Sequence, residues 1–100
     1  MPSTPTPPDA IFPKLAAHAR LRDDAQSGAT MLLYPEGALV LDDTAAEIIK
    51  RCDGVRTVET IAAELTEAFE GNAAAIASDV RDCLRELEER GLVHLNARPS

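Results

Sequence analysis

The sequence predicts an α+β domain, similar to a winged helix-turn-helix, in which an N-terminal three-stranded antiparallel sheet is followed by three helices. One hundred residues form a single domain with one modest core. Hydrophobic residues make up 45% of the chain but aromatic residues only 3%, which favours helices that pack aliphatic side chains on a small sheet. The period of the apolar residues changes from two to about 3.6 near residue 43, where strands give way to helices.

The two ends of the chain differ in composition from its middle. Residues 1–12 begin with a stretch rich in proline, serine and threonine, and we expect a flexible tail there. Residues 13–95 form the predicted domain, and residues 96–100 are expected to fray.

Short segments between residues 17 and 41 carry the predicted sheet. Residues 17–22 alternate between small or apolar and basic side chains, which is typical of a half-buried strand. Residues 30–34 and 38–41 are separated by Pro35 and Gly37, which favour a tight hairpin turn. We therefore predict a three-stranded meander, and residues 92–95 are expected to add a short closing strand.

The first predicted helix follows the meander directly. Asp43 or Thr44 is expected to cap its start. Gly54 is expected to end it, with Val55 in contact with Ile49 beyond the last turn.

Two further helices complete the predicted domain. The second begins at the cap Thr57, and its apolar stripe extends to Phe69. The third is the longest and ends at Gly91, with Leu92 packed against Leu87. Its apolar face consists of Ile76, Val80, Leu84 and Leu87.

The charge of the chain argues against several classes of partner. Seventeen acidic and ten basic residues give a net charge of −7, which repels phosphate backbones and anionic membranes. The three predicted helices are acidic too, so the DNA-binding role of a winged helix is not expected. The chain lacks an apolar run long enough to span a membrane and the features of a signal peptide. We expect a cytoplasmic protein with no nucleic-acid or membrane partner.

The sequence contains no pattern that predicts catalysis. Cys52 and Cys83 are expected to be reduced core thiols, with a disulfide between them as the alternative. Together with His18 and His94 they lack the close spacing of zinc ligands. We therefore predict no enzyme activity, no metal and no cofactor.

The third predicted strand has an unusual edge. Residues 38–41 are apolar on both faces and carry no charge or proline, the devices that usually protect an exposed strand edge. One interpretation is that the third helix covers this edge, or that two copies form a dimer through it. The other is that a guest peptide adds as a further strand beside the helix. Arg81 and Arg85 would then meet acidic residues of the guest.

Several motifs follow one another in order along the chain: Pro13, Leu15, Arg20, Leu21, Leu33-Tyr34-Pro35-Glu36-Gly37, Leu41, Ala45-Ala46-Glu47-Ile48, Cys52-Asp53-Gly54-Val55-Arg56-Thr57-Val58, Asp79-Val80, Leu84, Leu87 and Gly91-Leu92. Together, in this order and at this spacing, they resemble the PqqD family, the small peptide chaperones of pyrroloquinoline quinone (PQQ) biosynthesis. The resemblance covers about residues 13 to 93. Two positions depart from the family pattern: Asp42 replaces Asn, and an aromatic residue near Cys83 is absent.

The resemblance implies a function as a leader peptide recognition element. It implies that the chain binds the ribosomal precursor peptide by strand addition and presents it to a radical SAM enzyme, which carries out the chemistry. It also implies a binding site between the third strand and the third helix. The residues expected to bind the peptide are Leu39, Val40 and Leu41 on the strand and Val80, Arg81, Leu84 and Arg85 on the helix. The alternative remains a structural interaction domain that dimerises through its third strand.

Overall fold

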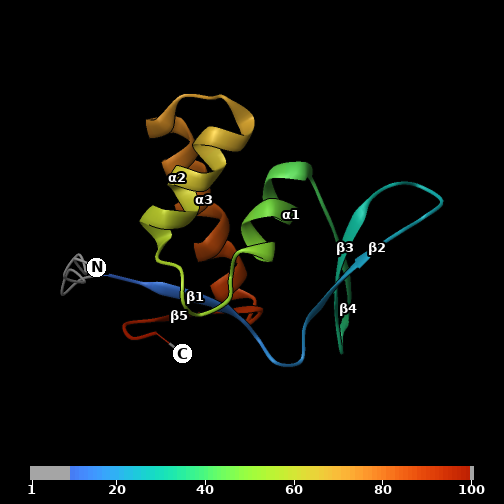
Figure 1. The fold of residues 1–100 in the computed structure, drawn as a ribbon. Coiled ribbons are helices and arrows are strands. Elements are labelled where there is room, and N and C mark those ends of the chain that lie inside the picture. Colours follow the sequence, from blue (N-terminus) through green and yellow to red (C-terminus); the bar gives the residue numbers. More distant parts are fainter. Residues whose placement is uncertain (1–9, 100) are drawn as a thin grey trace.

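The computed structural model describes residues 10–99, and this part of the chain forms three helices and two antiparallel sheets (Figure 1). The mixed α+β class predicted from the sequence is therefore confirmed. In chain order the elements are β1 (Phe12–Leu15), β2 (Arg20–Asp23), β3 (Thr30–Tyr34), β4 (Gly37–Leu41), α1 (Asp43–Lys50), α2 (Val58–Phe69), α3 (Ala73–Glu89) and β5 (Val93–Asn96).

Strands β2, β3 and β4 form a meander in that order. The hairpin between β3 and β4 pairs Tyr34 with Gly37 and leaves Pro35 and Glu36 as its two-residue loop. Strand β2 starts three residues later than predicted, because the chain turns at residues 17 and 18. The amide of Ala19 donates to the carbonyl of Ala16 at 3.0 Å across this turn.

A second sheet joins the two ends of the described chain. The closing strand predicted at residues 92–95 is present as β5, one residue later, but its partner β1 was not predicted from the sequence. Strand β1 pairs with β5 from Phe12–Asn96 to Leu15–Val93, and Phe12 is only 4% exposed. The ordered domain therefore begins before residue 13, Asn96 is paired, and the meander is not the N-terminal element. The remainder of the predicted tail and frayed end, residues 1–9 and 100, lies outside the described residues.

The start of α1 differs from the prediction. Its cap is Asp42, whose side chain accepts a hydrogen bond from the amide of Ala45 at 2.7 Å, and neither Asp43 nor Thr44 takes this role. The end of the helix differs as well, because it stops at Lys50 and Val55 is 62% exposed. The expected helix end at Gly54, with Val55 against Ile49, is therefore wrong: three residues separate Lys50 from Gly54, too many for that type of helix end.

The ends of α2 and α3 agree better with the sequence. Thr57 caps α2 by accepting from the amide of Thr60 at 3.1 Å. At the end of α3 the amide of Leu92 donates to the carbonyl of Leu87, and that of Gly91 to Glu88, which is the predicted Schellman motif. Phe69, expected in the apolar stripe of α2, is 42% exposed because it lies in the last turn of the helix.

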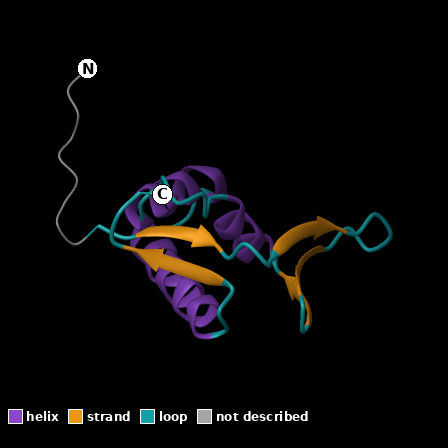
Figure 2. Cartoon of the chain, turned by 90° about the horizontal axis from the view of Figure 1, so that it is seen from below, coloured by secondary structure: helices purple, strands orange, loops and turns teal. Residues whose placement is uncertain are grey.

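The core lies where the helices meet the inner faces of both sheets (Figures 1 and 2). Helix α1 stands between the α2–α3 pair and the meander, whereas β1 and β5 lie across the other end of the helices. No described helix is both long and apolar enough to cross a membrane. The similarity to a winged helix-turn-helix remains a prediction. The fold leaves β4 at the outer edge of its sheet, beside α3.

Candidate functional site

A groove runs between the outer edge of β4 and helix α3. Strand β4 is the last in its sheet, and no further strand of residues 10–99 pairs with its outer edge. The groove has a volume of about 180 Å³ and is lined by Leu39, Val40, Leu41, Asp42, Ala45, Cys83, Glu86 and Leu87. We call it the edge groove.

The side chains of β4 alternate between the core and solvent. Leu41 is buried and Leu39 half-buried, and both contribute to the core. Val40 is 66% exposed, an unusual position for an aliphatic side chain on an unprotected strand edge. The edge groove therefore offers backbone hydrogen-bonding groups together with an apolar surface.

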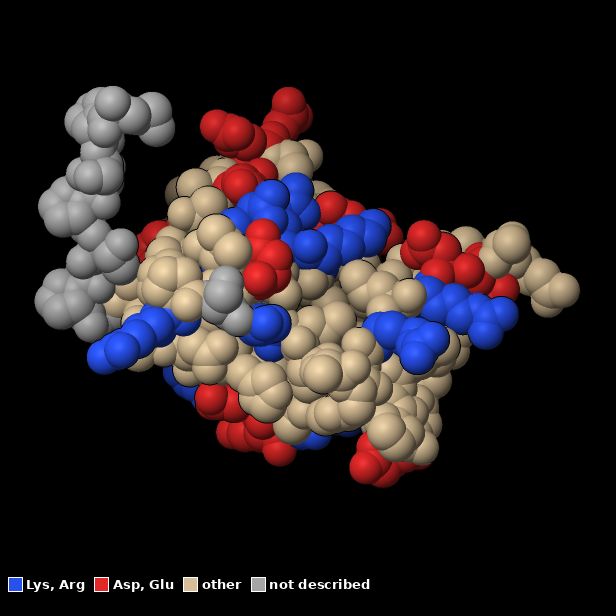
Figure 3. Space-filling model, turned by 60° about the horizontal axis from the view of Figure 1, so that its bottom comes forward, with Lys and Arg blue, Asp and Glu red and all other residues tan. Residues whose placement is uncertain are grey.

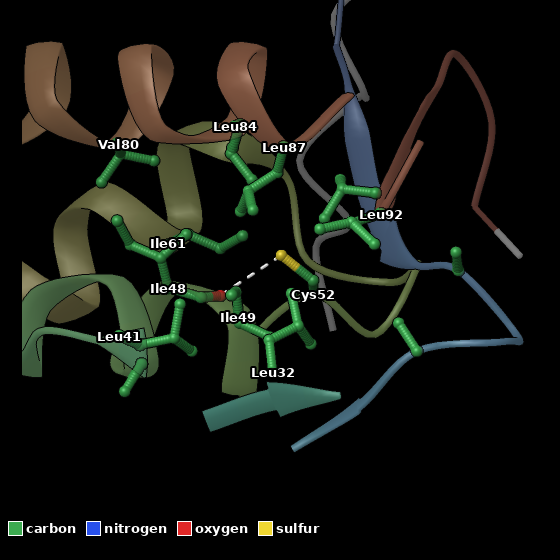
Figure 4. Close-up of a cluster of buried hydrophobic side chains, with 14 of the residues drawn as sticks. Leu32, Leu41, Ile48, Ile49, Cys52, Ile61, Val80, Leu84, Leu87 and Leu92 are labelled. Atoms are coloured by element: carbon green, nitrogen blue, oxygen red, sulfur yellow. Dashed lines mark hydrogen bonds between the residues drawn. The ribbon is translucent and has the colours of Figure 1, made fainter. Parts of the chain in front are cut away.

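The structure places the residues predicted on α3 differently from those on the strand. Figure 4 shows Val80 and Leu84 pointing into the core with Ile61, and they are 0% and 1% exposed. They support the groove from within the core and do not line it. Arg81 and Arg85 are exposed but do not line it either. Each residue of an α-helix is rotated by about 100° from the one before it. Arg81 and Arg85 therefore point more than about 100° away from the side of α3 that faces the groove.

The α3 residues that do face the groove were missed in the sequence. Cys83, Glu86 and Leu87 line the edge groove. Leu87 belongs to the edge of the apolar stripe, and Cys83 and Glu86 lie beside it, because residues three and four positions apart share a helix face. This arrangement is visible in the sequence, but the direction in which it faces depends on how α3 packs against the meander.

A second hollow continues from the edge groove toward α1. It has a volume of about 430 Å³, and we call it the acidic hollow. Its lining consists of Asp42, Thr44, Ala45, Ile48, Asp79, Asp82, Cys83 and Glu86.

The thiols of this region are not suited to nucleophilic chemistry. Burial raises the pKa of Cys52 to about 12 and that of Cys83 to about 11, with smaller contributions from nearby thiol and carboxylate groups. Both cysteines are free, and Cys52 donates a weak hydrogen bond to the carbonyl of Ile48 (Figure 4). Because a reactive cysteine needs a lowered pKa, these are structural thiols. Among residues 10–99 no three histidine, cysteine or acidic side chains are grouped as a metal site.

Away from the two hollows, three carboxylates pair with arginines, namely Glu47, Asp53 and Glu64. Arg51 contacts Glu47 and Glu64 at 2.9 Å each, and Arg56 contacts Glu64 at 3.2 Å. The hydrogen bond from Arg51 is the main reason why the pKa of Glu47 is lowered. Figure 3 shows basic side chains gathered near the middle of one face, with acidic ones beside them. This network ties α1 to α2 and lines neither hollow.

Comparison with known proteins identifies the family to which the chain is similar. The family model described as coenzyme PQQ synthesis protein D (PqqD) matches residues 29–93. A PqqA binding protein of Rhizobium meliloti is 40% identical over 82 residues, which cover 82% of this chain and 84% of that relative. One from Xanthomonas axonopodis pv. citri is 37% identical and covers 83% of this chain and 90% of the relative.

Two solved structures are similar as well. The solution structure of the PqqD truncation of Methylobacterium extorquens PqqCD is described as a functional, stand-alone recognition element for ribosomally synthesised and post-translationally modified peptides. It has a TM-score of 0.73 and 32% identity, covering 84% of this chain and 88% of that one. The crystal structure of PqqD from Xanthomonas campestris has a TM-score of 0.57 and 31% identity, covering 93% and 94%. These findings confirm the resemblance seen in the sequence: the chain belongs to the PqqD family.

Proposed function

We propose that this chain binds a precursor peptide of the PqqA type as an added strand on β4 and presents it to the radical SAM enzyme of PQQ biosynthesis. Two observations on relatives support the proposal: they are named PqqA binding proteins, and one is described as a peptide recognition element. The observation that carries it here is the edge groove beside the edge of β4 with which no strand of residues 10–99 pairs.

The edge groove has the two properties that strand addition requires. A guest strand gains main-chain hydrogen bonds from the free edge, and alternate guest side chains enter the groove. Leu39, Leu41 and Leu87 provide apolar contacts for those side chains. Val40 would be covered by the guest, which removes an exposed aliphatic side chain from water.

This proposal keeps the predicted strand residues and changes the helix residues. Leu39, Val40 and Leu41 contact the guest, as expected from the sequence. On α3 the contacts come from Cys83, Glu86 and Leu87, while Val80 and Leu84 hold the helix in place. Arg81 and Arg85 remain available to another partner on the solvent side of α3.

The mechanism is physical rather than chemical. Binding orders a flexible guest, which costs conformational entropy, and raises its effective concentration at the enzyme that also binds the carrier. The two thiols have raised pKa values and take no covalent part. The radical chemistry therefore belongs to the partner enzyme.

An NMR titration of the ¹⁵N-labelled protein with the PqqA peptide tests the proposal. We expect shift changes at residues 39–42 and 82–87, and few at the opposite edge strand β2. Val40→Lys should weaken binding by about tenfold, because a charged side chain on a strand edge opposes pairing. Val55→Lys is the matched control, since Val55 is a similarly exposed valine away from the groove. Equal effects of the two variants, or no shift changes in the folded protein, would contradict the proposal.

The alternative function is self-association through β4. The exposed Val40 on a free edge favours it, because two copies could pair there as well as a guest could. Sedimentation of the wild type over a range of concentrations distinguishes the two. A dimer that Val40→Lys dissociates, and that the peptide does not displace, would support the alternative.

A further inference from the structure

The edge groove and the acidic hollow form one continuous surface with two different ends. They share Asp42, Ala45, Cys83 and Glu86. The end along β4 is apolar, whereas the end toward α1 adds Asp79 and Asp82. A peptide strand that leaves the edge of β4 past Leu41 therefore reaches a set of carboxylates.

These carboxylates come from two separate segments and face the same space. Asp42 follows β4, and Asp79, Asp82 and Glu86 lie on one face of α3. Of the described residues, no lysine or arginine lines either hollow. Glu86 has one ion pair, to the exposed Arg90 at 3.3 Å, and Asp42 accepts the capping hydrogen bond from Ala45.

Ion pairing divides the described acidic side chains outside the hollows. Glu47, Asp53 and Glu64 each have an arginine partner, whereas others such as Glu67 and Glu88 have none, so position on a concave surface is what distinguishes the carboxylates of the acidic hollow. No ion pair joins Asp79 or Asp82 to a described basic residue. Carboxylates that converge on a concave surface concentrate the negative potential there.

The thiol between the two segments is affected by this potential. The pKa of Cys83 is raised first by burial and then by Asp42 and Glu86. One of these carboxylates follows β4 and the other lies on α3. Their charges therefore act together at the junction of the two hollows.

We propose that the guest is a peptide with a lysine or arginine directly beside its apolar strand segment, and that this cation is bound in the acidic hollow. This inference rests on the proposed function and specifies the chemistry of the guest. The apolar segment lies along β4, and the cation lies past Leu41, between Asp42 and the Asp79–Asp82 face of α3. The guest side chain beside the strand is thus positively charged, whereas Arg81 and Arg85 led us to expect acidic residues on the guest.

The test compares two double variants of equal charge. D79N/D82N removes two carboxylates from the acidic hollow, and E67Q/E88Q removes two exposed carboxylates that line neither hollow. Both change the net charge by the same amount, and all four positions are exposed helix sites, so folding is preserved. The probe is fluorescently labelled PqqA peptide, and its dissociation constant is measured by anisotropy at low and high salt.

We expect D79N/D82N to weaken binding by about three- to tenfold at low salt, since each partly exposed ion pair contributes modestly. The control should bind like the wild type, and the difference should shrink at high salt. Replacing the flanking lysine or arginine of the peptide by glutamine should weaken binding to the wild type but have little effect with D79N/D82N.

Other outcomes distinguish a failure of the cation site from a failure of the proposed peptide binding. If the wild type binds the peptide and D79N/D82N binds it equally well or more tightly, the inference is wrong while the proposed function stands. If the wild type does not bind the peptide at all, both are wrong.

Discussion

At the scale of single residues, the site depends on where each side chain of α3 points. The sequence identifies an apolar stripe correctly, since Val80 and Leu84 are buried. It does not reveal which neighbouring stripe faces β4. Two flanking stripes exist, one with Arg81 and Arg85 and one with the carboxylates, and only the packing of α3 against the meander decides between them.

The two thiols allow a prediction about reactivity. At pH 8 both should react with iodoacetamide far more slowly than in the unfolded chain, by roughly hundredfold or more, because the thiolate is the reactive form. Cys83 should react faster than the more deeply buried Cys52. Saturating PqqA peptide should protect Cys83 further. Mass spectrometry of the labelled protein measures all three effects.

The same raised pKa values set the direction of the alkaline pH dependence. Above pH 9 the unfolded thiols lose their protons, whereas the folded ones keep them until about pH 11 and 12. The free energy of unfolding contributed by these groups is therefore complete below pH 9 and is lost as the pH rises through this window. The variant Cys83→Ser should reduce the slope. If iodoacetamide labelled the two thiols of the folded protein as fast as it labels them in urea, the raised pKa values would be contradicted.

At the scale of elements, the start of α1 forms part of the surface where the two hollows meet. Asp42 caps this helix, and the adjoining Ala45 lines both hollows. The sequence placed the cap one or two residues too late, because Asp42, Asp43 and Thr44 are all good capping residues. The end of β4 decides among them, since the cap must have an extended backbone between strand and helix.

The cap gives a prediction with a close control. Asp42→Ala should lower the free energy of unfolding by about 1 kcal/mol, because the amide of Ala45 loses its acceptor. Asp42→Asn should be nearly neutral, because an asparagine oxygen accepts the same bond. Urea denaturation measures both. Equal losses for the two variants would mean that charge, and not the hydrogen bond, stabilises this position.

At the scale of the whole molecule, the β1–β5 sheet joins the two ends of the described part of the chain. Strand β1 is short and contains Pro13, which weakens any strand prediction. The proline is tolerated because β1 has a full strand partner on one side, β5, and only an isolated bridge from Lys14 to Asp53 on the other. A pairing between distant segments leaves no local trace in the sequence.

Two phenylalanines test where the domain begins. Phe12→Ala should lower the free energy of unfolding by about 3–4 kcal/mol, since Phe12 is buried and its loss leaves a cavity. Phe69→Ala should cost about 1 kcal/mol or less, because its side chain is largely exposed already. Thermal or urea unfolding compares them. A neutral Phe12→Ala would place the start of the domain at residue 13, as the sequence suggested.

The sequence by itself determined the α+β class, the three helices, the β3–β4 hairpin and the family. These depend on local periodicity, on capping residues such as Thr57 and Gly91, and on motifs that are close together in the chain. Only the tertiary structure decided that β1 pairs with β5 and that the carboxylates of α3 face β4. Both depend on contacts between distant segments, and the rotation of a helix about its axis is set by all the surfaces that it packs against.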